Sequence, residues 1–157
     1  MRGDREGNMK EIRIRRISYS PGYGDMLGGY HVITLENDKD GNWIYACSDR
    51  ETHNEPTITT TYAVSEEALA EFEEFIMSND VLSLENRPKS DIFATDYSPW
   101  SWSIDHLTTS FGKTKREYCS FGEYKEYSPS DRELLSKLKE RFTALRGEKI
   151  SEAIEKR

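Results

Sequence analysis

An alternation of apolar and polar side chains through residues 100–107 constrains the fold more than any other stretch. Trp100, Trp102, Ile104 and His106 occupy every second position, and each residue between them is a serine or an aspartate. Because successive side chains of a β-strand point to opposite faces, this pattern predicts a strand with one aromatic, apolar face and one polar face. We therefore expect the sheet and the core to form around this strand.

Other segments predict the rest of an antiparallel sheet. They are alternating or β-branched in sequence, and turn residues separate them. The strongest hairpin signal is the Asn, Asp and Gly-rich segment 37–42 between two alternating runs. The further strands expected begin with 12–19, in which Arg15-Arg16 marks either a bulge or the end of the strand, and continue with 30–36, 43–47, 57–64 and 114–121.

Two segments have the apolar period of amphipathic helices. The first, about 65–78, follows Ser65, a capping residue, and carries glutamates in its first turn, where acids suit the helix dipole. The second starts at Ser130, with Glu133 three residues later in the pattern of a capping box. Either this helix ends at Gly147, or it continues beyond Gly147 with a weaker apolar pattern. These elements predict an α+β fold, in which an antiparallel sheet of about five or six strands carries two main helices on one face.

The length of 157 residues favours one domain. We expect a disordered leader over 1–9, a single α+β domain over 10–147, and a helical or frayed tail over 148–157. No apolar run approaches the roughly 20 residues of a membrane helix, and the first residues do not resemble a signal peptide. The sequence therefore predicts a soluble, cytoplasmic protein.

The two cysteines, Cys47 and Cys119, are not part of a CxxC pair. Reduced, buried thiols are the simplest expectation for them. A disulfide stays open as an alternative, because both residues fall in expected strands.

The net charge of −7 is unevenly spread, since both ends of the chain are basic and the body is acidic. An acidic body repels phosphate backbones, so nucleic acid is not an expected partner, and neither is a membrane. The cluster Arg13, Arg15 and Arg16 could contact an anion. A solvated strand edge or tail is the simpler interpretation of these three residues.

The residues that commonly carry catalysis form no known motif. His31, His53 and His106 lack HxH or HExxH spacing, so neither a metal nor another cofactor is expected. Asp105 and His106 are adjacent on a strand and face opposite ways, so they cannot orient one another as an acid-base pair. The sequence therefore favours a protein that is not an enzyme.

Aromatic residues in two loop-like segments, 20–29 and 91–99, give the best candidate for a site. Tyrosine and tryptophan are favoured at binding surfaces, where one end of the side chain stays in water. If the two loops meet at one end of the sheet, they form a shallow aromatic groove with acidic edges, suited to a neutral or cationic ligand. The candidate ligand-binding residues are Tyr23, Asp25, Asp96, Tyr97 and Trp100.

The order of elements resembles uncharacterised bacterial domains in layout. The hairpin Tyr30–Cys47, the Thr-rich strand and the helix from Ser65 occur there in the same order, over about residues 28–145. The resemblance implies no activity and gives no residue a role. Two function classes stay open: a non-catalytic binding or interaction domain, with a protein, a small ligand or a second copy as partner, or a small-molecule-binding protein or enzyme with a site between the two loops.

Overall fold

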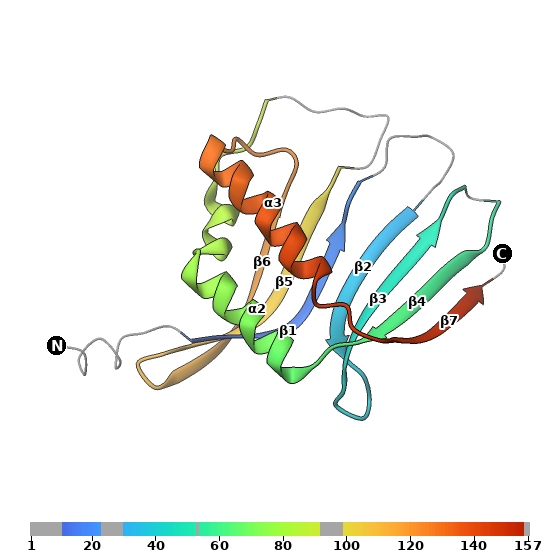
Figure 1. The fold of residues 1–157 in the computed structure, drawn as a ribbon. Helices are drawn as coiled ribbons and strands as arrows, with labels where there is room; N and C mark the ends of the chain where they lie inside the picture. Colours follow the sequence, from blue (N-terminus) through green and yellow to red (C-terminus); the bar gives the residue numbers. More distant parts are fainter. Residues whose placement is uncertain (1–10, 23–29, 53, 92–98, 156–157) are drawn as a thin grey trace.

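The computed structural model describes residues 11–22, 30–52, 54–91 and 99–155, which form an antiparallel sheet with helices packed on it (Figure 1). The seven strands lie in the order β6-β5-β1-β2-β3-β4-β7. The strands are β1 (Glu11–Ser20), β2 (Tyr30–Asn37), β3 (Trp43–Arg50), β4 (Thr57–Ala63), β5 (Ser101–Ser110), β6 (Lys113–Gly122) and β7 (Lys149–Glu155). The helices are α2 (Glu66–Ser78), the short 3-10 helix η1 (Val81–Asn86) and α3 (Pro129–Thr143). The α+β class is confirmed, with more strands than the five or six predicted; the predicted leader lies outside the described residues.

Strand β5 has the two faces that the alternation predicts. Trp102, Ile104 and His106 are buried, whereas Ser101 and Ser103 are exposed. The Trp102 ring meets the edge of the Phe142 ring of α3, with centroids 5.1 Å apart. Aromatic pairs in this edge-to-face arrangement add to the stability that burial itself provides. The strand is thus part of the core, flanked by β1 and β6 in the sheet.

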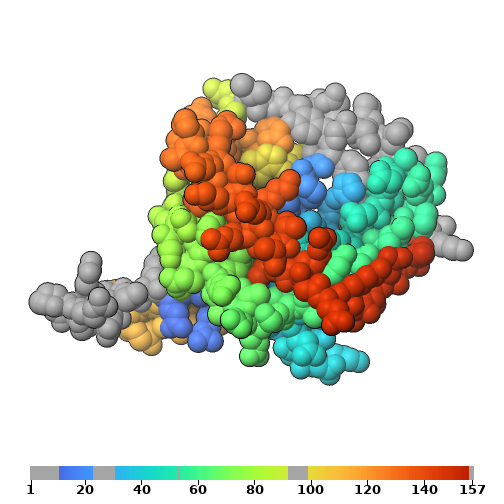
Figure 2. Space-filling model, viewed as in Figure 1, coloured from blue at the N-terminus to red at the C-terminus, as the bar shows by residue number. Residues whose placement is uncertain are grey.

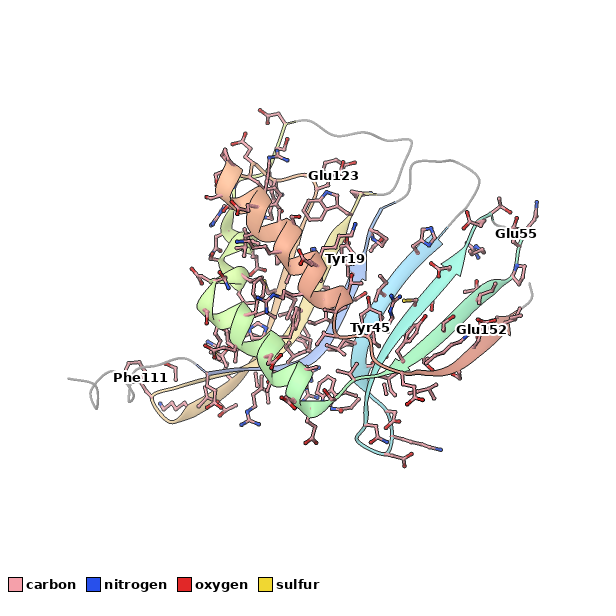
Figure 3. All side chains as sticks on the ribbon, viewed as in Figure 1. Tyr19, Tyr45, Glu55, Phe111, Glu123 and Glu152 are labelled. Carbon is pink, nitrogen blue, oxygen red and sulfur yellow. The ribbon has the colours of Figure 1, made fainter. Side chains whose placement is uncertain are left out.

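Both main helices cover the same face of the sheet (Figure 1). Helix α2 buries Leu69, Phe72, Phe75 and Ile76, and α3 buries Leu138 and Phe142. Tyr19 and Tyr45 contact Phe142 from β1 and β3, with ring centroids 6.2 Å and 5.2 Å away (Figure 3). The predicted arrangement of two main helices on one face is therefore present.

The cap residue of α3 lies two residues before the predicted one. Ser128, not Ser130, is the cap residue: its hydroxyl accepts from the Asp131 amide at 3.0 Å, and the Asp131 carboxylate accepts from the Ser128 amide at 3.1 Å. Ser128 and Ser130 both have an acidic residue three positions later, so the two registers look alike in sequence. Pro129 favours the observed one, because proline suits the first helical position.

The predicted helical or frayed tail is instead strand β7, which pairs with β4 over Thr57–Tyr62. Gly147 starts this pairing: its amide donates to the Ala63 carbonyl at 2.9 Å, and the Ala63 amide donates to the Glu148 carbonyl at 2.8 Å. A β-carbon on Gly147 would lie 2.6 Å from the Ala63 carbonyl oxygen. The glycine therefore allows the close approach that turns the chain from α3 onto β4.

Both cysteines are free thiols. Cys47 lies on β3 and Cys119 on β6, strands separated by three others in the sheet, so the disulfide alternative is wrong. Among the described residues, no helix combines the length and the apolar character required to span a membrane.

Candidate functional site

The described neighbours of the two candidate loops lie at one end of the sheet. Ser20, the last residue of β1, is opposite Ser101, the first residue of β5. Four of the five predicted site residues, Tyr23, Asp25, Asp96 and Tyr97, lie outside the described residues. Trp100 is the one whose surroundings the structure describes.

The Trp100 ring is half-buried and packs on Tyr127, which precedes α3. The two rings are stacked, with centroids 5.9 Å apart and planes 25° from parallel. Tyr127 is held in place because its hydroxyl donates to the Gly122 carbonyl at 2.6 Å. Burial raises the pKa of Tyr127 to about 12, so this hydroxyl stays a proton donor at neutral pH. Trp100 is therefore supported by a rigid neighbour, while part of the indole remains accessible.

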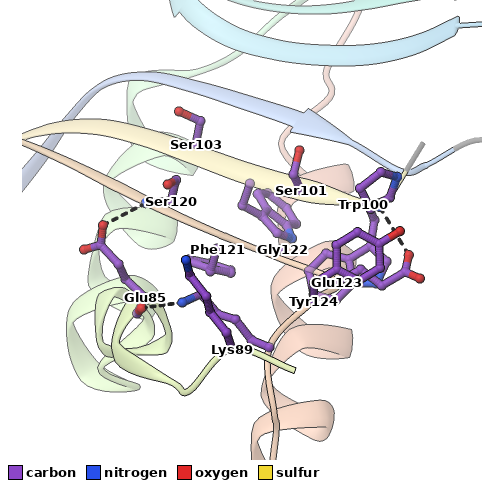
Figure 4. Close-up of a pocket in the computed structure, with 13 residues that line it drawn as sticks. Glu85, Lys89, Trp100, Ser101, Ser103, Ser120, Phe121, Gly122, Glu123 and Tyr124 are labelled. Carbon is purple, nitrogen blue, oxygen red and sulfur yellow. Dashed lines mark hydrogen bonds between the residues drawn. The ribbon is translucent and has the colours of Figure 1, made fainter. Parts of the chain in front are cut away.

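Trp100 lines a hollow of about 570 Å³ at the end of β5 and β6 (Figure 4). This volume lies in the range of sites that hold small organic ligands. Ser101 and Ser103 of β5 and Ser120 of β6 also line it. The hollow thus offers an indole ring beside a row of groups that can both donate and accept hydrogen bonds.

Four charged side chains around the hollow are balanced in sign: Glu85, Lys89, Glu123 and Lys125. Lys125 Nζ donates to the carbonyls of Glu85 and Arg87, at 2.7 Å and 3.1 Å. The Glu85 carboxylate accepts from the Ser120 amide at 3.3 Å. Two carboxylates and two ammonium groups cancel, so the described rim favours a neutral ligand; the predicted acidic edges rest on Asp25 and Asp96, outside the described residues.

Sequence reasoning missed these charged residues because they come from separate segments. Glu85 lies on η1 and Lys89 follows it, and both reach the hollow because this segment runs along the edge of β6. An isolated bridge between Lys89 and Lys125 fixes the two segments to each other. No periodic pattern in the local sequence indicates such a contact. The position of Trp100 beside a loop, by contrast, could be predicted from the alternation of apolar and polar residues around it.

A second hollow, of about 440 Å³, lies on the face of the sheet opposite the helices and contains the predicted arginine cluster. The bulge after Ile14, one of the two alternatives predicted from the sequence, leaves Arg15 and Arg16 exposed side by side. Arg16 donates to Glu36 at 3.0 Å, and Arg116 of β6 donates to both carboxylate oxygens of Asp105. These acids neutralise much of the positive charge, which agrees with the simpler interpretation of a solvated surface.

The described histidines are held by structural contacts. His106 is buried, and its Nδ1 lies 3.3 Å from the Ile104 carbonyl. Asp105 faces the other side of the sheet, as the alternation predicts, and pairs with Arg116. His31 bonds to Asp49 across β2 and β3. Within the described ranges, no group of three or more His, Cys, Asp or Glu residues could hold a metal ion.

No protein-family model matches this chain, and neither a curated protein nor a solved structure matches it. The resemblance in layout to bacterial domains stays a prediction. Function is therefore argued from the geometry of the site alone.

Proposed function

We propose that this chain is a non-catalytic binding domain whose ligand lies in the hollow beside Trp100. The observation that carries the proposal is the supported, partly buried indole ring at the wall of a hollow of ligand size. Most large apolar side chains of the described chain lie in the core, whereas this one lines an open space. Such anchors, apolar on one side and wet on the other, are typical of binding surfaces.

The chemistry of the lining favours a neutral ligand with one apolar face and several hydroxyl groups, such as a saccharide. One face of a sugar ring carries C–H groups that pack on an aromatic ring. Its hydroxyls match Ser101, Ser103 and Ser120, and the carboxylates of Glu85 and Glu123 are further acceptors. The balanced charge of the rim gives no net attraction for a phosphate or an ammonium group.

The experiment follows the indole N–H signals of the three tryptophans by NMR during titration with neutral disaccharides such as maltose, cellobiose and diacetylchitobiose. We expect the Trp100 signal to move while the Trp43 signal stays, because Trp43 lies on β3, away from the hollow. Inorganic phosphate serves as the charged control and should move neither.

Two variants sharpen the assignment. Trp100→Ala should abolish the shifts that a disaccharide causes in the backbone amide signals of Ser120 and Gly122, which also line the hollow, and the matched change Trp43→Phe should leave these shifts intact. If millimolar disaccharides leave the Trp100 signal unmoved, or if Trp100→Ala responds like the unchanged protein, the proposed site is wrong.

A further inference from the structure

The two edges of the sheet are protected to different degrees. Outside β6, the Glu85 carboxylate accepts from the Ser120 amide, and the Cys119 thiol lies 3.4 Å from the Leu82 carbonyl of η1. The other half of β6 carries Lys113, Lys115 and Arg116, and charges of this kind discourage another strand from pairing. The β6 edge is thus blocked by neighbouring segments and by charge.

Strand β7 forms the other edge, and all seven of its residues are exposed. In Figure 2 this strand, drawn in red, lies along the rim of the molecule. Among the described residues outside β4 and β7, none donates or accepts a hydrogen bond along β7. A strand of this length with a row of free backbone groups is a template for pairing with another chain.

Apolar side chains also gather at this edge. Ile58 of β4 and Ile154 of β7 are cross-strand neighbours, 37% and 57% exposed, and Ile150 is 54% exposed. These three are most of the exposed large apolar residues in the described part of the chain; the others are Phe111 and Tyr118. A cluster of such residues on one edge is typical of an interaction surface rather than of scattered surface side chains.

The sequence of β7 is complementary to itself in the antiparallel direction. When two copies pair about Glu152, Ile150 faces Ile154 and Lys149 faces Glu155 of the other copy. The two Glu152 carboxylates also face each other, and each lies 3.2 Å from the ammonium group of Lys149 on its own strand. Opposite charges and apolar pairs at directly opposed positions stabilise an antiparallel sheet. The bulge of β7 falls at Ile150, between the partners of Thr61 and Tyr62, so residues 151–155 form a regular strand and the pairs made by Lys149 and Ile150 lie at the bulged end.

We propose that β7 is the pairing edge for a second copy of this chain, which gives a two-fold symmetric dimer with one continuous sheet. The inference does not depend on the hollow beside Trp100. Pairing joins the two β7 edges and leaves a blocked β6 edge at each outer end. The assembly therefore closes at two copies and does not extend into a filament.

Sedimentation over a range of concentrations tests the dimer, with Ile154→Lys as the disrupting variant and Phe111→Lys as the matched control. Phe111 is 71% exposed and lies at the far hairpin (Figure 3). We expect the unchanged protein to form a dimer. Its dissociation constant should rise at least about 30-fold in Ile154→Lys, because an apolar anchor of the interface is lost, and should be unchanged in Phe111→Lys. A monomer at every concentration, which is also the result if β7 pairs with a different protein, overturns the proposal.

A cross-link tests the register. The cysteine of Glu152→Cys lies next to its symmetry mate in the proposed dimer and should form an intermolecular disulfide under mild oxidation. Lys115→Cys on β6 is the control and should stay monomeric on a non-reducing gel. Equal cross-linking of the two variants contradicts the pairing, and because both positions are exposed, neither change threatens the fold.

Discussion

The β5–β6 half and the β4–β7 half of this sheet have the same antiparallel pairing but very different surroundings. Strand β5 buries four of its alternating side chains, from Trp102 to Thr108, under helices and η1. Strand β7 buries none of its residues and pairs with β4 along its length. Hydrogen-bonded pairing alone therefore does not decide which strands are stable; apolar burial on one face does.

The difference also separates the two proposals in space. The hollow beside Trp100 lies at the end of the covered half, where helices and η1 bring polar and charged groups around it. The self-complementary edge lies in the uncovered half. A rigid, well-packed half suits a preorganised ligand site, whereas an open edge suits pairing with another strand.

The largest expected effect is the loss of the ring at the centre of the covered half. Trp102→Ala removes a side chain that is 2% exposed and should lower the free energy of unfolding by about 3–5 kcal/mol. The matched change in the open half, Ile154→Ala, should cost less than about 1 kcal/mol in the monomer, because that side chain is already largely in water. Urea denaturation measures both, and equal losses would mean that the two halves do not differ in packing.

The next effect concerns the ion pair that holds the end of η1 to α3. Arg87 donates to both oxygens of Asp131, at 2.8 Å and 2.9 Å, and this guanidinium lowers the pKa of Asp131 to about 2. Asp131→Ala should cost roughly 1.5–3 kcal/mol, the range for hydrogen bonds to charged groups. Glu133, an exposed carboxylate that pairs with Lys137, is the matched control. Glu133→Ala should lower the free energy of unfolding by about 0.5 kcal/mol or less.

The same pair predicts a pH dependence. A carboxyl group whose pKa is lowered by folding stabilises the protein above its unfolded pKa, near 4, and loses this contribution as the pH falls toward 2. The unchanged protein should therefore lose stability between about pH 4 and pH 2 in thermal melts. Asp131→Ala should lack this part of the loss; an identical pH profile would show that the ion pair does not stabilise the fold.

Gly147→Ala tests how the open half is attached. The added β-carbon would lie 2.6 Å from the Ala63 carbonyl, so the turn onto β4 has to shift, at a cost of about 1–3 kcal/mol. We expect faster hydrogen exchange in β4 and β7 while β5 is unaffected. Ala144→Ser, an exposed change three residues earlier, is the control, and uniform loosening of the whole sheet would contradict the local role of Gly147.

The smallest effect is a difference between the two thiols. Burial raises the pKa of Cys119 to about 12, and burial together with the nearby Asp49 raises the pKa of Cys47. Because the thiolate is the reactive form, both should react with a disulfide reagent more slowly than free cysteine at pH 8. Cys47, half-buried on β3, should react before the buried Cys119, and faster modification of Cys119 would contradict this order.

The covered half could largely be predicted from sequence because its signals are local. The alternation through Trp102 and Ile104 and the cap at Ser65 of the covering helix each rest on neighbouring residues, as does the turn at 37–42 between β2 and β3. Strand β7 could not be predicted in the same way. Ile150 and Ile154 are four residues apart, which also suits a helix, and the partner strand β4 lies about ninety residues earlier.

The candidate site was predictable only in part for the same reason. Trp100 could be predicted as a candidate site residue because it alternates with Trp102 and lies beside a loop-like segment. Glu85 and Lys89 reach the hollow only because η1 passes along the edge of β6, a tertiary contact that neither composition nor spacing reveals. The charge of the rim, and with it the preference for a neutral ligand, therefore required the structure.

Residue-resolved hydrogen exchange of β6 and β7 at low and high protein concentration tests the contrast between the two edges most directly. We expect the Ser120 amide, which donates a hydrogen bond to the Glu85 carboxylate, to be protected at both concentrations. We expect the β7 amides that point away from β4 to exchange quickly when the protein is dilute and to become protected as it is concentrated. Equal protection of both edges, independent of concentration, would contradict this contrast.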